Sequence, residues 1–184
     1  MEKEFIFLLE CKGIEYSSLI TTESAVQKDN STKKITSGIE QLVSVTCQLK
    51  NGVFDQLLGN VRNKLIISAV VTYKHLYFAN NNWYWKDILG KSLKDEIRKE
   101  QDYLFEIKPQ ILSIDELEHL LIYSKQTEKN YLEIFTEKEA KHQGFGGDWI
   151  NYLTLNEDEK GAFFLKEAYQ NYFDANLERV QNTK

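Results

Sequence analysis

Glu10 and Lys12 are the two residues whose types and spacing best suit chemistry. They follow five consecutive apolar residues, 5–9, and are followed by Gly13. A short apolar run rich in Phe and closed by glycine predicts a buried strand. Because side chains alternate along a strand, Glu10 and Lys12 should share one face and Cys11 should lie on the other. A carboxylate there can hold a divalent cation, while the ammonium group orients the water that attacks a phosphodiester.

A helix is predicted downstream of this strand, and it carries a third polar candidate, Gln41. Ser37, with Glu40 three residues later, has the form of a capping box and predicts that the helix begins at Ser37. The helix should continue to about residue 49 and end at Asn51-Gly52. Its apolar stripe has helical spacing and consists of Ile39, Leu42, Val43, Thr46 and Leu49.

The segment before this helix, residues 27–34, is polar throughout and is predicted to be an exposed loop. Its lysines are the first candidates for contacts with phosphate. A lysine in such a loop can equally be a solvated surface residue with no ligand.

A second strand is predicted over residues 65–73, a continuous and largely β-branched run typical of a central strand covered on both faces. A strand, a helix and a second strand in this order predict a βαβ unit with a right-handed crossover. The two strands should therefore be parallel, with the Ser37 helix packed across them. The aromatic segments 76–78 and 83–85 are expected to follow as further sheet residues that pack in the core or stack on bases.

The Glu-x-Lys strand followed by a helix with a glutamine resembles the second half-motif of the PD-(D/E)xK nuclease superfamily, over roughly residues 1–80. The resemblance implies a restriction-endonuclease-like α/β fold: a mixed central sheet with flanking helices. Gln41 matches the helix glutamine that lies near the metal in RecB-like members. The aromatic residue that those members often place four positions later is Val45 here.

The same resemblance implies a site and its ligands. Glu10 and the backbone carbonyl of Cys11 would bind Mg²⁺ or Mn²⁺, Lys12 would orient the attacking water, and Gln41 would support them. The substrate would be nucleic acid, with DNA favoured, and the activity that of an endonuclease or exonuclease.

One feature of the family has no counterpart in the sequence before Glu10. Family members carry another acidic residue on the preceding hairpin strand, and only nine residues precede Glu10. The missing carboxylate is expected from Glu2 or Glu4, from a second copy or a partner subunit, or from sequence upstream of Met1.

The second half of the chain is predicted to be mainly helical, with a domain boundary that separates an α/β core, 1–88, from a helical region, 89–184. Helices are expected over 91–103, 112–123, 126–140 and about 157–180. Ser113 and Glu116 form a second capping box. The glycine-rich segment 144–147 lacks the lysine and hydroxyl of a phosphate loop and is expected to be a turn.

The amino-acid composition is that of a globular protein without a generally basic surface. The chain has 184 residues, 42% hydrophobic and 28% charged, as in ordinary globular proteins. Its net charge of −5 excludes a general basic field, so any nucleic-acid site must be a local patch. No segment resembles a membrane span or a signal peptide. The two cysteines, Cys11 and Cys47, lack metal-ligand spacing and are expected to be reduced core thiols of a cytoplasmic protein.

Three functions remain open from the sequence. The first is the metal-dependent nuclease. The second is a catalytically incomplete nuclease-like domain that binds DNA or serves in assembly. The third is an unrelated acidic α/β protein-interaction domain, in which Glu10 and Lys12 form a strand-end salt bridge worth at most about 1 kcal/mol.

Overall fold

The computed structural model describes residues 5–14, 30–76, 78–141 and 149–154. The elements of this part, in chain order, are β1 (Phe5–Lys12), α2 (Asn30–Lys50), α3 (Asp55–Leu58), β2 (Leu65–Thr72), a π-helical segment η1 (Tyr84–Leu89), α4 (Gly90–Ser92), α5 (Asp95–Leu104), β3 (Gln110–Ser113), α6 (Ile114–Thr127), α7 (Tyr131–Lys141) and α8 (Trp149–Thr154). The architecture is α/β.

The three described strands form one sheet in the order β1-β2-β3, and both pairs are parallel. In register, Lys12 lies beside Thr72, and Thr72 lies beside Ser113, so the carboxyl ends of all three strands share one edge. The predicted parallel pairing of the first two strands, with a helix between them, is confirmed. A mixed sheet was expected, whereas every pairing among the described strands is parallel.

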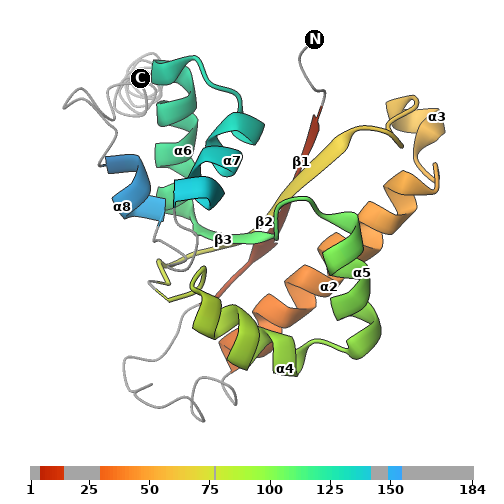
Figure 1. Cartoon of the computed structure of the whole chain (residues 1–184), viewed down its shortest axis with the longest axis horizontal. Coiled ribbons are helices and arrows are strands. Elements are labelled where there is room, and N and C mark those ends of the chain that lie inside the picture. Colours follow the sequence, from red (N-terminus) through yellow and green to blue (C-terminus); the bar gives the residue numbers. More distant parts are fainter. Residues whose placement is uncertain (1–4, 15–29, 77, 142–148, 155–184) are drawn as a thin grey trace, which may run out of the picture.

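Helices cover both faces of this sheet (Figure 1). The layer of α2, α4 and α5 lies on one side, and α6, α7 and α8 lie on the other. Successive side chains of β1 point to opposite faces of the sheet and so contribute to the hydrophobic core on each face. Ile6 and Leu8 pack on the α2 side, and Phe5 and Phe7 pack on the α6–α8 side. All residues of β2 except Leu65 are buried, as expected of the central strand.

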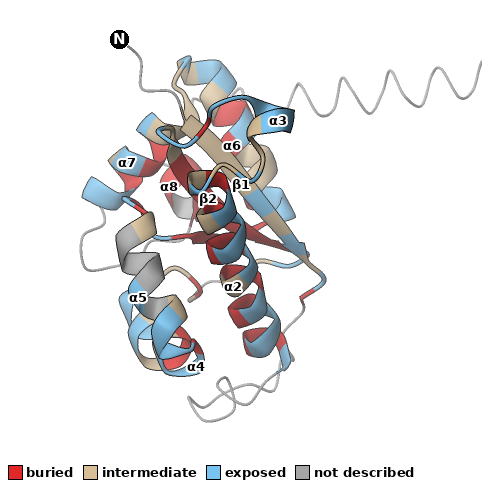
Figure 2. Cartoon of the chain, turned by 90° about the vertical axis from the view of Figure 1, so that its right-hand side faces the viewer, coloured by how far each residue is buried: buried red, intermediate tan, exposed pale blue. Residues whose placement is uncertain are grey.

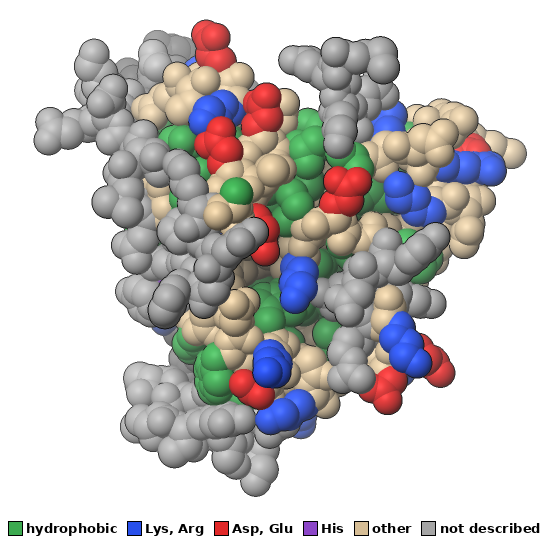
Figure 3. Space-filling view, viewed as in Figure 1, with side chains coloured by type: hydrophobic (Ala, Val, Ile, Leu, Met, Phe, Trp, Pro, Cys, Tyr) green, Lys and Arg blue, Asp and Glu red, His purple; other side chains and the backbone are tan. Residues whose placement is uncertain are grey.

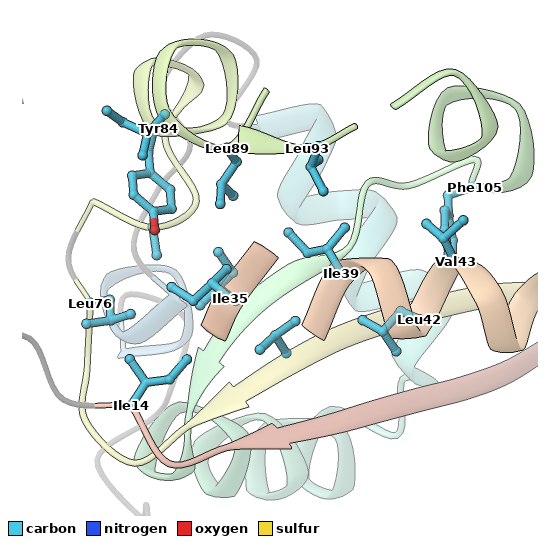
Figure 4. Packing of buried hydrophobic residues seen from close by; sticks show 14 of the residues in the cluster. Ile14, Ile35, Ile39, Leu42, Val43, Leu76, Tyr84, Leu89, Leu93 and Phe105 are labelled. Carbon is cyan, nitrogen blue, oxygen red and sulfur yellow. The ribbon is translucent and has the colours of Figure 1, made fainter. Parts of the chain in front are cut away.

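The core on the α2 side carries the predicted apolar stripe. Ile39, Leu42, Val43, Thr46 and Leu49 are all buried. Figure 4 shows Ile35 and Ile39 of α2 between the sheet and the layer that contains Leu89 and Leu93. The buried and exposed faces of α2 alternate along its length in Figure 2, which is the pattern of an amphipathic helix. This packing fixes the orientation of α2 relative to the carboxyl end of β1.

The predicted start of the helix is wrong by about two turns. α2 begins at Asn30, so residues 30–34 are helical rather than a loop, and Ser37 lies inside the helix. The reason is that the buried stripe extends upstream through small polar and apolar side chains, Ser31, Thr32, Ile35 and Thr36. A Ser-x-x-Glu pattern marks a helix start only where the preceding residues have no face to bury.

A third strand, β3, was missed in the half predicted to be helical. It follows Pro109 and has four residues, all buried. Because β3 pairs with β2, the sheet continues past residue 88, the predicted boundary. The helix predicted from 112 begins instead at Ile114, and its capping box is confirmed: Ser113 Oγ accepts from Glu116 N–H (3.1 Å), and a Glu116 carboxylate oxygen accepts from Ser113 N–H (2.7 Å).

The aromatic segment 83–85 is not part of the sheet. Trp83 precedes η1, and Tyr84 and Trp85 lie in it. Asn81 Oδ1 accepts a hydrogen bond from the Tyr84 amide (2.7 Å), a local contact that favours a helical turn over an extended strand. The expected helix at 91–103 corresponds to α4 and α5, and that at 126–140 to α7. The predictions for residues 144–147 and 157–180 lie outside the described residues.

Candidate functional site

Glu10, Lys12 and Gln41 lie together at the carboxyl end of β1, on the side covered by α2. We call these three residues the polar cluster. Lys12 Nζ lies 2.9 Å from Glu10 Oε1 and donates a hydrogen bond to Gln41 Oε1 (2.5 Å). The side chains of Lys12 and Glu10 are 18% and 30% exposed, and Gln41 is exposed. The expected proximity of Gln41 to Lys12 is confirmed, and the three polar groups reach solvent.

Gly38 allows α2 to approach the strands closely enough for this contact. A Cβ atom at Gly38 would lie 3.1 Å from a methyl group of Val70 and 3.4 Å from Cε of Lys12. The absence of a side chain therefore leaves room for both β2 and the stem of Lys12. Gly38 was not predicted as a site residue, although an isolated glycine within a helical pattern is a signal of close packing.

A pocket of about 350 Å³ adjoins the polar cluster and is lined by Lys12, Asn30, Lys33, Lys34 and Ser37. We call it the lysine pocket. Lys34 Nζ donates a hydrogen bond to the carbonyl oxygen of Gly13 (2.9 Å), which ties the start of α2 to the end of β1. Lys33 and Lys34, two of the lysines predicted as phosphate contacts in a loop, thus belong to the first turns of α2, whereas Lys28 lies outside the described residues.

Glu10 is the only carboxylate of the polar cluster. Among the described residues, no three His, Cys, Asp or Glu side chains come together as a metal site would require. Mg²⁺ is commonly bound by one or two carboxylates together with water and substrate phosphates. Glu10 therefore suits one carboxylate position of such a site, and the polar cluster contains no second carboxylate.

Cys11 is exposed, so the prediction of a core thiol at this position is wrong. Among the described residues, the α6–α8 layer covers the first half of this strand, where Phe7 packs against Tyr131 and Phe135. At the far end of the same face, Leu9 is 44% exposed and Cys11 follows it. The thiol points away from the polar cluster because side chains alternate, so only the backbone carbonyl of Cys11 remains a candidate ligand.

A second group of polar residues, which was not predicted from the sequence, lies at the carboxyl ends of β2 and β3. We call it the buried carboxylate cluster. Glu116 Oε1 lies 3.0 Å from His75 Nε2 and accepts a hydrogen bond from the Trp149 amide (3.1 Å). Its other oxygen accepts from Ser113 N–H. The Glu116 side chain is only 3% exposed. The capping-box pattern located Glu116, but nothing local indicated its contacts with His75 and Trp149.

The buried carboxylate cluster borders a pocket of about 410 Å³ lined by Tyr73, Lys74, His75, Ile114 and Asp115. Glu116 itself does not line this pocket. Its oxygens contact backbone amides and His75, which is the arrangement that a buried carboxylate needs for stability. We therefore assign Glu116 to the fold rather than to ligand binding.

No described helix combines the length and apolar character needed to cross a membrane. On the face shown in Figure 3, acidic and basic side chains are interspersed. Comparisons with protein-family models, with curated proteins and with solved structures find no match to this chain. The likeness to the PD-(D/E)xK superfamily therefore depends on the Glu-x-Lys strand, the helix glutamine and the βαβ order.

Proposed function

We propose that this chain supplies the Glu-x-Lys part of a metal-dependent nuclease site that hydrolyses phosphodiesters in nucleic acid. The observation that carries the proposal is the contact of Lys12 with both Glu10 and Gln41 at the carboxyl end of a parallel strand. Three polar side chains from two elements converge there, and open α/β sheets commonly bind their ligands at this edge.

Each residue has a defined role in this proposal. Glu10 and the carbonyl oxygen of Cys11 would hold Mg²⁺ or Mn²⁺, and Gln41 would hold Lys12 in place. The ion would supply Lewis-acid stabilisation of the phosphate and a more acidic bound water. Lys12, placed within hydrogen-bonding distance of Glu10, would orient the attacking water with its ammonium group. Glu10 would give up part of its contact with Lys12 when it binds the ion.

Because Glu10 is the one carboxylate of the polar cluster, we expect low metal affinity and a low rate of cleavage. With Glu10 alone, the chain should bind Mg²⁺ weakly and cut nucleic acid slowly, unless another carboxylate joins the site. Glu2 or Glu4, a second copy of the chain, or a partner subunit could provide it. If a second copy does so, the rate of cleavage should rise more steeply than the first power of protein concentration.

The test is cleavage of single- and double-stranded DNA and RNA with Mn²⁺. Glu10→Ala and Lys12→Ala should each lower the rate by about 100-fold or more, the usual effect of removing a group that acts at the reacting phosphate. Glu106→Ala and Lys99→Ala remove exposed residues of the same charge and should leave the rate unchanged. The same slow background in all five proteins would contradict a nuclease.

A second candidate function, a nuclease-like domain that binds nucleic acid without cutting it, is favoured by the single carboxylate beside three lysines. It predicts that nucleic acid binds equally well with and without divalent cation and that Glu10→Ala does not weaken binding. A nuclease site should instead bind more tightly when Ca²⁺, which supports binding but rarely cleavage, is added.

A further inference from the structure

We infer that the lysine pocket binds a phosphate group of a polynucleotide strand and thereby holds the strand beside Glu10 and Lys12. The inference rests on the proposed function for the class of substrate, but it concerns different residues. Its basis is the pocket itself: a concave site that the described residues line with three lysines, an asparagine and a serine, and with no acidic residue.

The three lysines that line the pocket differ in whether an anionic group neutralises their positive charge. Lys12 is paired with Glu10. Lys34 donates to the carbonyl of Gly13, a neutral partner that orients the ammonium group but does not neutralise it. Lys33 has neither a hydrogen bond nor an ion pair with any described residue and is exposed. Two positive charges of the pocket therefore lack an anionic partner within the described part of the chain.

The polar lining matches the chemistry of a phosphate group. Ser37 and Asn30 add a hydroxyl and an amide to the ammonium donors, and a phosphodiester presents acceptor oxygens but no donors. Charge-assisted hydrogen bonds of this kind are about twice as strong as neutral ones. A volume of about 350 Å³ is at the small end of ligand pockets, large enough for a nucleotide-sized group.

The position of the pocket links it to the proposed reaction. Lys12 belongs both to the lining of the pocket and to the polar cluster. A phosphate held by Lys33 and Lys34 would therefore place the adjoining part of its strand near Glu10. Because the chain carries a net charge of −5, such a local contact would have to overcome a general repulsion of nucleic acid.

The experiment measures binding separately from cleavage. The full chain is titrated into a fluorescent single-stranded DNA of about 20 nucleotides, longer than a typical single-strand site, in EDTA and between about 50 and 200 mM salt. Lys33→Ala should weaken binding about 3- to 10-fold and reduce the slope of log K against log salt by about 0.7. Lys33→Arg, which keeps the charge, should bind within about 2-fold of the unchanged chain.

Lys99→Ala is the matched control because Lys99 is an exposed helix lysine outside the pocket. An equal loss of affinity in Lys33→Ala and Lys99→Ala would show a general effect of net charge and overturn the inference. No effect of Lys33→Ala would overturn it as well. A titration with inorganic phosphate, followed by amide shifts over residues 30–37, provides the other arm. Shifts with phosphate but no DNA binding would leave only a small-anion site and contradict the polynucleotide assignment.

The outcomes separate this inference from the proposed function. Binding that depends on Lys33, without cleavage that depends on Glu10, supports the lysine pocket and contradicts the nuclease. Cleavage that depends on Glu10, with binding indifferent to Lys33, supports the nuclease and contradicts the pocket.

Discussion

The polar cluster and the buried carboxylate cluster lie at the same edge of the sheet but are held in different ways. Glu10 and Lys12 contact other side chains and stay partly exposed. Glu116 is almost fully buried, and its oxygens accept from two backbone amides and contact His75. A carboxylate fixed by backbone amides stabilises the fold, whereas one fixed only by a flexible lysine can exchange that partner for a ligand. Burial and the type of hydrogen-bonding partner, rather than charge alone, therefore distinguish the two clusters.

The largest expected effect is on stability at the buried carboxylate cluster. Glu116→Ala removes the acceptor for Ser113 N–H and Trp149 N–H and the partner of His75. It should lower the free energy of unfolding by about 3 kcal/mol, because buried donors lose a hydrogen-bond acceptor. Urea denaturation measures this change. Glu118→Ala, at a partly exposed position of the same helix, should cost less than about 0.5 kcal/mol; similar losses in both would break the distinction drawn above.

The next largest effect is expected at Gly38, which lets α2 lie close enough to the strands for Gln41 to contact Lys12. Gly38→Leu places a side chain where even a Cβ would lie 3.1 Å from Val70 and 3.4 Å from Lys12. It should destabilise the chain by about 2 kcal/mol, as overpacking does, and move Gln41 away from Lys12. Ser44→Leu, at an exposed position of the same helix, is the control. Urea denaturation gives the stabilities, and a Gly38→Leu chain as stable as the control would show that close approach is not needed.

The α6–α8 side should also lose stability at high pH. Burial raises the pKa of the Tyr152 hydroxyl above its usual value near 10, helped by the negative charge of its neighbours Tyr123 and Glu137. Because the folded state holds this proton more tightly than the unfolded state, stability is full below about pH 10 and falls above it. The slope should not exceed about 1.4 kcal/mol per pH unit. Denaturation from pH 8 to 11 should show a smaller fall in Tyr152→Phe; identical curves would contradict the assignment.

The smallest expected effect is the contribution of the polar cluster to stability. A double-mutant cycle of Glu10→Ala and Lys12→Ala should give a coupling free energy below about 1 kcal/mol, as for partly exposed ion pairs. Urea denaturation of the four proteins measures it. A coupling as large as the loss in Glu116→Ala would mean that the polar cluster is also a fold anchor, which would weaken the case for a ligand site there.

The sequence by itself determined the elements that carry the polar cluster. The apolar run before Glu10 and the β-branched run of β2 predict strands from composition alone, and the strand–helix–strand order predicts their parallel pairing. The stripe of α2 placed Gln41 on a helix between them. These features depend on near neighbours in the chain, such as side-chain alternation, helical periodicity and the handedness of the crossover, and for that reason they could be predicted.

Three features depend on tertiary structure: the strand β3, the exposure of Cys11 and the contact of Glu116 with His75. β3 has only four residues, too few for a periodic signal, and is a strand because β2 offers it an open edge. Cys11 is exposed because, within the described part of the chain, the α6–α8 layer covers the first half of β1 and not its end. Glu116 meets His75, which lies 41 positions earlier in the chain, only through the pairing of β2 with β3. Pairing, layer coverage and burial bring together residues distant in sequence, so no local pattern of side chains encodes them.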